Sequence, residues 1–288
     1  MKLSLILDID HQYGDFHPEV PHADLSGLSG VNGYCSEGAA GRFRKVIRGS
    51  GKDSVLEGFS AGKSSETPLR DPAVSTPWSG IHLFGSGNYH YISKFFLETI
   101  AEPFNLLLID NHPDMEVPAF PLLSCGSWVL DSLRELPNLQ QVYMFGVRPD
   151  LFSECLAAGT GTPYQDRVTL LPLPETGTGR QKIDAGNGRA DIRSEQVDAR
   201  QLNSVLAFRL PVPSDLPLYI SIDKDALSQE YAVTDWDQGK LTLDNLCQFL
   251  SDVKGKRLLG ADICGDSRAE ADNPLNIAST EAILKLLG

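Results

Sequence analysis

Positive charge is scarce in this 288-residue chain. Lys and Arg together number 25 against 38 Asp and Glu, so the formal net charge is −13. A protein that binds nucleic acid needs concentrated positive charge to neutralise phosphates, and we therefore exclude that class of partner. Long apolar runs are also lacking. None approaches the roughly 20 residues needed to cross a bilayer, so we expect no membrane-spanning segment.

Cysteine is sparse too, with five residues at wide spacings and no CxxC motif. An odd number of scattered cysteines argues against a disulfide framework and favours a reducing compartment. The apolar run at the amino terminus meets Asp8 after a few residues, which is too short for a signal peptide. We therefore expect a cytoplasmic protein.

Several short apolar runs end at a glycine or a polar residue, and helical patterns lie between them. Runs that are apolar on both faces are typical of strands covered on both sides, as in a parallel sheet. The alternation predicts an α/β fold with a mostly parallel sheet, in one domain spanning residues 1–288. Residues 11–78 and 174–200 are rich in Gly and polar residues, and we expect long loops there. The expected strands cover residues 3–9, 81–84, 104–109, 141–147, 168–173, 218–222 and 257–263, and the expected helices 91–100, 127–136, 243–253 and about 279–287.

Acidic and imidazole side chains follow three of the predicted strands. Residues i and i+2 of a strand project to the same side, which pairs Asp110 with His112 and Asp223 with Asp225. Asp114 follows a proline, where the chain has turned and can fold back. In open α/β sheets, ligands bind beyond the carboxyl ends of the strands. We therefore expect these side chains to converge with His90, which follows a Gly-rich strand end.

Four carboxylates in one pocket repel one another, and divalent cations remove that cost. Mixed His and Asp ligands suit Mn²⁺, Fe²⁺, Zn²⁺ or Co²⁺ better than Ca²⁺ or Mg²⁺. Six ligands are too many for one open catalytic site but suit two ions with shared carboxylates. An Asp at a strand end is often only a cap or turn residue, and one Asp-x-Asp would be weak evidence. The combination favours a metal site made by His90, Asp110, His112, Asp114, Asp223 and Asp225.

These segments resemble the ureohydrolase family, which includes arginase, agmatinase and formimidoylglutamase. The family has a His after a Gly-rich strand end, a DAHxD-type segment and an SxDxD segment. The resemblance implies a three-layer α/β/α fold and two Mn²⁺ ions per chain bridged by a hydroxide, with Fe, Co or Zn as other possible metals. The matching segments in this chain are Gly85 to His90, Asp110 to Asp114 and Ser221 to Asp225.

The same resemblance assigns a role to each of the six side chains. Asp110 and Asp223 would bridge the ions, His90 and Asp114 would complete one, and His112 and Asp225 the other. Asp225 or a nearby acid would deliver a proton to the departing amine, which makes Asp225 a candidate catalytic residue.

The chain departs from the family where the substrate binds. Gly265 stands where the family has a Glu that grips a guanidinium, and Asp266 beside it would need a shifted loop to substitute. A buried guanidinium needs a paired carboxylate, so its loss favours a neutral amide or another C–N bond. Alternatively, a loop carboxylate supplies the charge, and the candidates are Glu116, Asp235 and Asp237.

Two further residues are candidates at the rim of the pocket. Cys125 replaces a family His proposed to shuttle protons, and at a helix start its pKa would be lowered, as a catalytic residue requires. A small rim residue is the alternative for Cys125. Arg148 follows a strand and would bind a substrate carboxylate or form a structural salt bridge.

The leading hypothesis is a dinuclear metal-dependent hydrolase that attacks an sp² carbon bonded to nitrogen in a small-molecule substrate. One alternative is a catalytically silent protein that keeps the metal ligands. A second is a deacetylase-like enzyme with one zinc ion, but that group needs an adjacent His pair, which this chain lacks. Members of the family often form homo-oligomers, so the resemblance is also compatible with a homo-oligomer.

Overall fold

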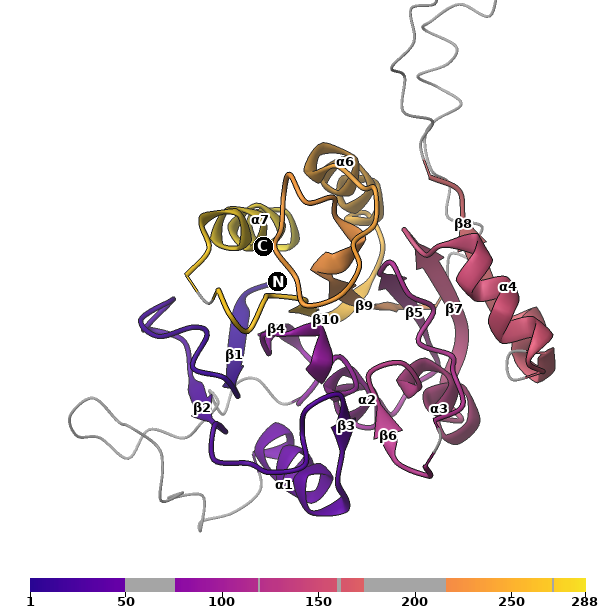
Figure 1. Ribbon diagram of the computed structural model, residues 1–288, viewed down its shortest axis with the longest axis horizontal. Helices are drawn as coiled ribbons and strands as arrows, with labels where there is room; N and C mark the ends of the chain where they lie inside the picture. The colour runs from indigo at the N-terminus through magenta and orange to yellow at the C-terminus, as the bar shows by residue number, and fades with distance from the viewer. Residues whose placement is uncertain (50–75, 119, 160–161, 174–215, 271) are drawn as a thin grey trace, which may run out of the picture.

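The computed structural model describes residues 1–49, 76–118, 120–159, 162–173, 216–270 and 272–288. Within these ranges one sheet of eight strands runs through the molecule, and all of its pairings are parallel (Figure 1). A separate antiparallel pair joins β3 (Tyr34–Cys35) to β6 (Leu123–Ser124). The order across the large sheet is β2 (His22–Asp24), β1 (Leu3–Asp8), β4 (Gly80–Leu83), β10 (Leu258–Cys264), β9 (Leu218–Asp223), β5 (Phe104–Ile109), β7 (Leu139–Phe145) and β8 (Val168–Leu171).

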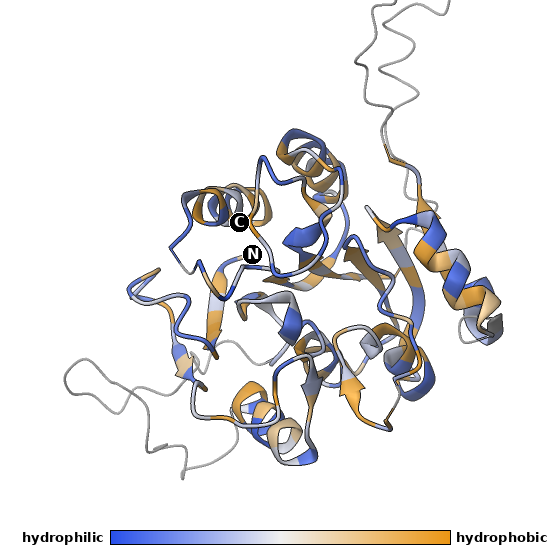
Figure 2. Cartoon of the chain, in the orientation of Figure 1, coloured by the Kyte–Doolittle hydropathy of each residue, from blue (hydrophilic) through white to orange (hydrophobic). Residues whose placement is uncertain are grey.

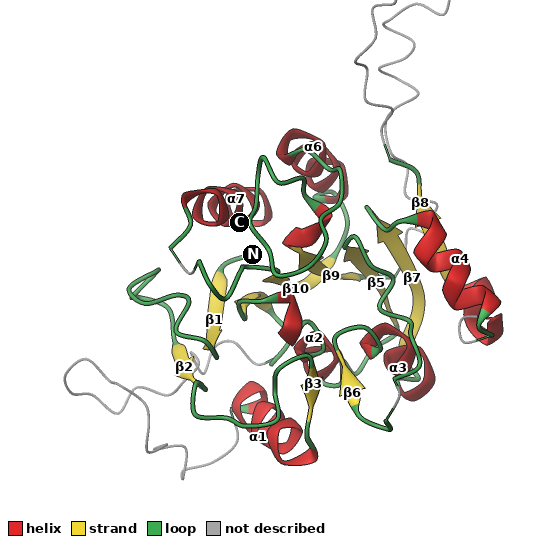
Figure 3. Ribbon diagram, in the orientation of Figure 1, coloured by secondary structure: helices red, strands yellow, loops and turns green. Residues whose placement is uncertain are grey.

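Helices cover both faces of the sheet (Figure 3). One layer consists of α1 (Glu37–Arg48), α2 (Ile92–Leu97) and α3 (Trp128–Glu135), with α4 (Pro149–Ala157) beside β8. The other layer consists of α6 (Leu243–Val253) and α7 (Pro274–Leu287). Short 3₁₀ turns follow three strands or loops: η1 (Gly87–Tyr89), η2 (Thr162–Arg167) and η3 (Lys224–Ala226). The fold is therefore a three-layer α/β/α arrangement.

Side chains of the central strands point alternately to the two faces of the sheet, so a hydrophobic core forms on each face. In β5, Leu106 and Leu108 pack under α2 and α3, whereas Leu107 and Ile109 pack under α6. Apolar residues accordingly pack on both faces of the sheet, and the helices carry a mixture of apolar and hydrophilic residues (Figure 2). A strand that is apolar throughout is the pattern of a sheet buried on both sides, as the sequence predicted.

The helix ends follow ordinary capping chemistry. Thr242 Oγ1 accepts from the backbone N–H of Asn245 at 3.1 Å and begins α6 at the expected place. Ser36 Oγ accepts from the N–H of Ala39 at 3.3 Å and begins α1, and Gly49 with φ of 60° ends it.

The prediction that residues 11–78 form one long loop is wrong for the part that the structure describes. β2, β3 and α1 lie within it. The last helix begins at Pro274, five residues before the expected start near Ser279. Asn273 caps it by accepting from the N–H of Leu275 at 2.9 Å, and Pro274 suits the first helical position because its missing N–H is not needed there. The loop expected at 174–200 lies outside the described residues.

Strand order decides where the functional groups meet. β9 lies between β10 and β5, and β10 pairs in turn with β4. Since all four strands are parallel, their carboxyl ends lie at one edge of the sheet, and the segments that follow them project into the same space. No helix in the described ranges combines the length and the apolar character that crossing a membrane requires.

Candidate metal centre

The structure brings the six predicted ligand side chains together at this edge. Asp110 directly follows β5, Asp223 is the last residue of β9, and Asp225 lies in η3 behind it. His90 is the residue at which η1 ends, after β4. All six side chains are buried except His112, whose side chain is 20% exposed.

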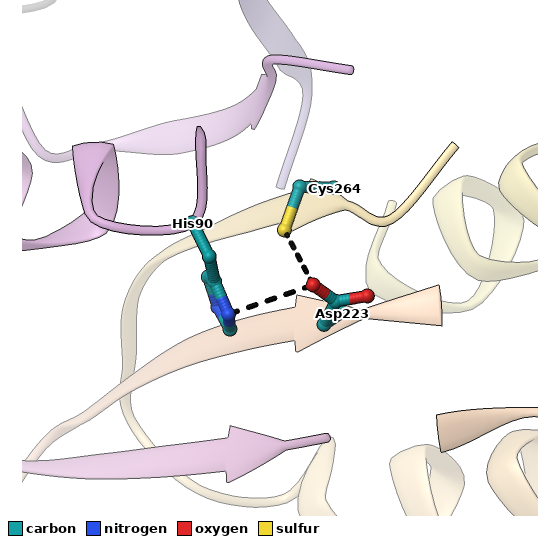
Figure 4. A group of neighbouring side chains, drawn as sticks. All are labelled: His90, Asp223 and Cys264. Carbon is teal, nitrogen blue, oxygen red and sulfur yellow. Dashed lines mark hydrogen bonds and ion pairs between the residues drawn. The ribbon is translucent and has the colours of Figure 1, made fainter. Parts of the chain in front are cut away.

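Three of these side chains form a first group around His90. Its Nδ1 lies 3.1 Å from Asp110 Oδ2 and 3.1 Å from Asp114 Oδ2. The same atom lies 3.7 Å from Asp223 Oδ2, which also accepts from Cys264 Sγ at 3.4 Å (Figure 4). Ligand atoms of His90, Asp110 and Asp114 are close enough together to hold one cation, as are those of His90, Asp223 and Cys264.

A second group forms around His112. Its Nδ1 lies 2.9 Å from Asp225 Oδ2 and 3.6 Å from Asp110 Oδ1. Asp110, His112 and Asp225 are also close enough together to share a cation. Because Asp110 belongs to both groups, its two oxygens face two neighbouring positions, which is the arrangement that a pair of ions with one shared carboxylate needs.

The two nitrogens of His90 differ in their surroundings. Nε2 lies 2.9 Å from Ser221 Oγ. Nδ1 is buried, and its close contacts with carboxylates lack hydrogen-bond geometry. A ring nitrogen that is shielded from water, without a hydrogen bond and close to several carboxylates fits a cation ligand better than a proton donor. The residues present therefore fit a metal centre.

Without cations, burial and neighbouring charges shift the pKa values of the side chains in these groups. Burial, together with the charge of Asp110, raises the pKa of Asp114 to about 7. Burial and the neighbouring Asp223 raise the pKa of Asp225 well above its ordinary value. Burial alone would lower the pKa of His90, but Asp110 and Asp114 raise it well above its usual range. Protons therefore take the place of positive charge in the bare cluster, as expected where carboxylates crowd together.

Trp128 positions one of the carboxylates, a role that the sequence did not reveal. Its indole Nε1 donates to Asp114 Oδ2 at 2.6 Å. Asp114 has a positive φ of 50°, the left-handed backbone that returns its side chain toward His90. The expectation that the chain folds back after Pro113 is confirmed by this geometry.

A buried hydroxyl and carboxyl network lies behind His90. Ser221 Oγ donates to Asp262 Oδ1 at 2.6 Å, and Ser93 Oγ donates to the same oxygen at 3.0 Å. Burial raises the pKa of Asp262 to about 6. Such partners orient a metal-binding histidine and fix its tautomer. The sequence did not identify Asp262 and Ser93 as partners of this network.

Two glycines let the backbone approach Asp223. A Cβ added at Gly87 would lie 2.6 Å from Asp223 Oδ2, and one added at Gly265 would lie 2.2 Å from Asp223 Oδ1. Gly265 also has a φ of 99°, which other residues rarely adopt. The position that the sequence resemblance matches to a guanidinium-binding Glu therefore has no room for a side chain.

A cavity of about 710 Å³ opens over the cluster. The six predicted ligands lie at its base, and Trp236, Leu151 and Val117 add apolar surface to its wall. Its charged wall residues beyond the ligands are Glu116, Glu154 and Asp237. A concave, partly apolar pocket over convergent polar groups is the usual form of a small-molecule site.

The structure places the predicted substrate-binding residues apart from this cavity. Asp266 is buried and forms an ion pair with the fully buried Lys224, and it lines a different cavity. Arg148 is exposed, and its guanidinium contacts Asp150 at 2.6 Å and Asp237 at 2.9 Å. The salt-bridge alternative for Arg148 therefore agrees with its contacts.

The other rim candidates differ in their placement. Cys125 does line the cavity, but burial raises the pKa of its thiol to about 12, opposite to the lowering that we expected. Asp235 accepts from Ser86 Oγ at 2.9 Å and from Ser267 Oγ at 3.0 Å, and it is not among the lining residues. Asp237 Oδ1 lies 2.9 Å from His112 Nε2, which connects the exposed rim to the second ligand group.

Sequence comparison finds one distant relative and no family model that matches the chain. An uncharacterised protein of Thermotoga maritima is 28% identical over 187 residues, which is 65% of this chain. The chain thus spans 58% of the length of that relative.

Structural comparison gives a clearer result. Arginase from Bacillus caldovelox aligns with 99% of this chain and 97% of its own, with a TM-score of 0.57 and 14% identity. Formimidoylglutamase from Bacillus subtilis aligns with 100% of this chain and 86% of its own, also with a TM-score of 0.57 and 14% identity. The protein therefore has the arginase-like fold that the sequence motifs predicted.

Proposed function

We propose that this protein is a metal-dependent hydrolase that cleaves a C–N bond in a small guanidino, amidino or amide compound. One observation carries the proposal: six candidate metal-ligand side chains from three separate chain segments meet at the base of one cavity. Five of them form two groups that share Asp110, and the sixth, Asp223, lies beside His90. Nothing in the packing of the fold needs four buried carboxylates at one point, whereas a pair of cations does.

The proposed ligands follow from the two groups. His90, Asp114 and Asp110 would hold one ion, with Asp223 within reach of the same imidazole. Asp110, His112 and Asp225 would hold the other. Mn²⁺ is the first candidate because it suits mixed carboxylate and imidazole ligands, and Fe, Co or Zn would fit as well. Cys264, on the first group, would add a softer ligand for Zn²⁺ or Fe²⁺.

Cations in this site would supply a nucleophile by lowering the pKa of a water molecule, and they would polarise the substrate. The chain's own residues do the rest. The cavity wall binds and orients the substrate over the cluster and limits the access of bulk water. Asp225, whose Oδ2 lies 2.9 Å from His112 Nδ1, is the proposed carrier of the proton that the departing amine takes. Asp237 on the far nitrogen of His112 holds that imidazole in place.

The lack of a carboxylate at position 265 restricts the substrates that the site can bind. A Glu cannot stand at position 265, because even a Cβ would collide with Asp223 and with the backbone of Lys224. A guanidinium at the cluster would therefore lack its family partner. This supports an amide, or a guanidine whose charge a residue of the cavity wall balances.

Metal analysis and a compound panel test the proposal together. The chain loaded with Mn²⁺ should hold two ions by elemental analysis and should release amine, urea or carboxylate from at least one guanidino, amidino or amide compound. Asp110→Asn and Asp223→Asn should each lose bound metal and at least about a hundredfold in turnover. Asp244→Asn, which changes an exposed carboxylate on α6, is the matched control and should keep both.

A catalytically silent metal-binding protein is the second candidate, favoured by Gly265. Two bound ions with no turnover of any compound in the panel would support it over the hydrolase. A single zinc ion per chain that hydrolyses an amide would instead support the deacetylase-like alternative.

A further inference from the structure

A loop beside the metal centre contains a run of apolar residues. The run covers residues 117–123 and includes no polar side chain. The loop is closed at its base, since the backbone N–H of Glu116 donates to the carbonyl of Gly126 at 2.9 Å. Pro118 and Pro121 each fix a backbone φ angle within it. A surface loop that is closed and restricted in this way can hold side chains ready for a ligand at a low cost in entropy.

A groove of about 430 Å³ lies between this loop and β3. The residues that line it are Tyr34, Pro118, Phe120, Leu122 and Ser124. Ser124 also lines the cavity over the metal centre, and so does Val117, which directly precedes Pro118. The groove therefore adjoins that cavity. We call Tyr34, Val117, Pro118, Phe120 and Leu122 the apolar rim.

Large side chains of the apolar rim are exposed to solvent. Phe120 is 72% exposed and Val117 56%, and Tyr34, which pairs with Ser124 across β3 and β6, is exposed as well. Within the described residues, seven large apolar side chains are exposed, and four of them line the cavity or the groove: these three and Trp236. Exposed apolar surface gathered in one place marks an interaction site.

The charges around this surface favour an uncharged ligand. In the part of the chain that the structure describes, neither the cavity nor the groove is lined by a Lys or an Arg, so a carboxylate of the ligand would have no partner. The groove itself has no carboxylate lining it among the same residues, so it offers an ammonium group no partner either. An apolar group, by contrast, would remove the rim from water.

The size of the groove favours part of a small molecule over a protein. An apolar cavity of about 150 Å³ is enough to hold benzene. The groove, with about 430 Å³, accommodates an aromatic ring or a branched alkyl group. A stable protein interface buries roughly 800 Å² on each partner, over about 20–30 residues. The five residues of the apolar rim are too few for such an interface. Because the groove adjoins the cavity, a molecule bound at the metal centre can reach it.

We propose that the apolar rim binds an aromatic or branched alkyl group of the substrate, which a short linker joins to the C–N bond cleaved at the metal centre. This inference rests on the proposed function and names its substrate class: amides or amidines with an uncharged, apolar tail. Phe120 and Val117 are its specificity-determining residues.

Three acetamides that share one linker and differ only at its end test the proposal. They are an N-(phenylalkyl)acetamide, the N-alkylacetamide and the N-(hydroxyalkyl)acetamide, each made with linkers of about two to five methylene groups to vary the reach. The same tails are tested on a guanidine head. Binding to the chain loaded with Mn²⁺ is measured by calorimetry, separately from turnover.

The phenyl compounds should bind about tenfold more tightly than the alkyl compounds, because the ring and the rim remove each other from water. The hydroxyl compounds should bind no more tightly than the alkyl ones. Added salt should change the preference for the phenyl tail little, since no charge is involved.

Substitutions at one exposed position test the assignment. Phe120→Ser should lose most of the preference while its Mn²⁺ binding and circular dichroism stay unchanged. Phe120→Leu, which keeps an apolar side chain, should retain most of it. Leu275→Ala shortens an exposed apolar side chain on α7 that lines neither the cavity nor the groove, and it should keep the preference in full.

A second copy of the chain is the other occupant to test. Sedimentation at the concentrations of the binding assay should give the same mass for the unaltered chain and for Phe120→Ser. An assembly that dissociates in Phe120→Ser would mean that the rim is an interface between copies, and it would overturn the ligand site.

The binding and turnover results separate this proposal from the hydrolase. Equal affinity for the three tails, no binding by any of them, or a phenyl preference that survives in Phe120→Ser overturns the apolar site. A phenyl preference in binding without any hydrolysis supports the apolar site and counts against the hydrolase. Hydrolysis that is indifferent to the tail counts against the apolar site alone.

Discussion

Ser221 and Asp262 face each other across β9 and β10, and the Ser221 hydroxyl donates to Asp262 Oδ1 over 2.6 Å. The same hydroxyl lies 2.9 Å from His90 Nε2. A strand neighbour thus fixes the orientation of the imidazole whose other nitrogen faces the carboxylates. Since the register of two buried strands sets this contact, the sheet itself helps to shape the metal centre.

Removing that hydroxyl should weaken metal binding. We expect Ser221→Ala to lower Mn²⁺ affinity by about tenfold or more, because His90 loses its orienting partner. Calorimetric titration of the metal-free chain measures the change. Ser132→Ala is the matched control, since Ser132 is also fully buried on α3 but its hydroxyl has no hydrogen bond within the described residues. An equal loss of affinity in both variants would contradict the orienting role.

The metal-free chain should lose stability as pH rises from about 4 to about 7. The pKa of Asp114 rises from 3.8 to about 7 on folding, so between these values the folded state holds a proton that the unfolded state has released. His90, whose pKa is also raised, extends the loss to higher pH. Melting temperatures measured across this range check the direction.

Saturating Mn²⁺ should reverse that trend. Ligand carboxylates bind metal only after they lose their protons, so the stabilisation by Mn²⁺ should grow as pH rises through 7. The difference in melting temperature with and without Mn²⁺, followed from pH 5 to 8, is the measurement. A difference that stays constant with pH would count against Asp114 as a ligand.

Gly265→Ala should weaken Mn²⁺ binding, in addition to the loss of stability that the strained backbone at this position causes. The new Cβ would lie 2.2 Å from Asp223 Oδ1, so Asp223 must move and Mn²⁺ binding should fall. Gly159→Ala separates the two effects, because Gly159 also has a positive φ, of 76°, but nothing lies within 4 Å of its added Cβ. That control should cost only about 1 kcal/mol of unfolding free energy and keep its metal affinity.

Cys125 should behave as a protonated thiol. Burial raises its pKa to about 12, so alkylation by iodoacetamide at pH 7.5 should be slow, and Cys125→Ala should keep turnover within about threefold. Mass spectrometry of the alkylated chain gives the rate at each cysteine, with the partly exposed Cys247 as the internal reference. Rapid labelling of Cys125 with loss of turnover would restore its predicted catalytic role.

The strands were the most predictable part of the fold. The expected strand at 104–109 has the bounds of β5, β9 ends one residue later than expected, and β10 begins and ends one residue later than expected. Runs apolar on both faces have few alternatives in a folded chain. α1 was missed although Ala39, Phe43 and Val46 recur at helical spacing, because Gly38 and Gly41 weaken the intrinsic preference for a helix.

The candidate site was predictable only where its residues stand in motifs. His90 and the paired Asp and His positions follow strands in a recognisable pattern, and the structure brings them together. The partners that orient them come from elsewhere: Trp128 from α3 and Asp262 from the middle of β10. Their contacts depend on tertiary packing, which local sequence does not encode. Glu154 was missed for the same reason, since α4 was not expected.

The position of β10 has a consequence during synthesis on the ribosome. Leu258–Cys264 fills the gap between β4 and β9, which precede it by up to about 180 residues in the chain. Until it emerges, both of those strands present bare edges, the kind of surface that promotes aggregation. A nascent chain that stalls before Leu258 would therefore need chaperone protection.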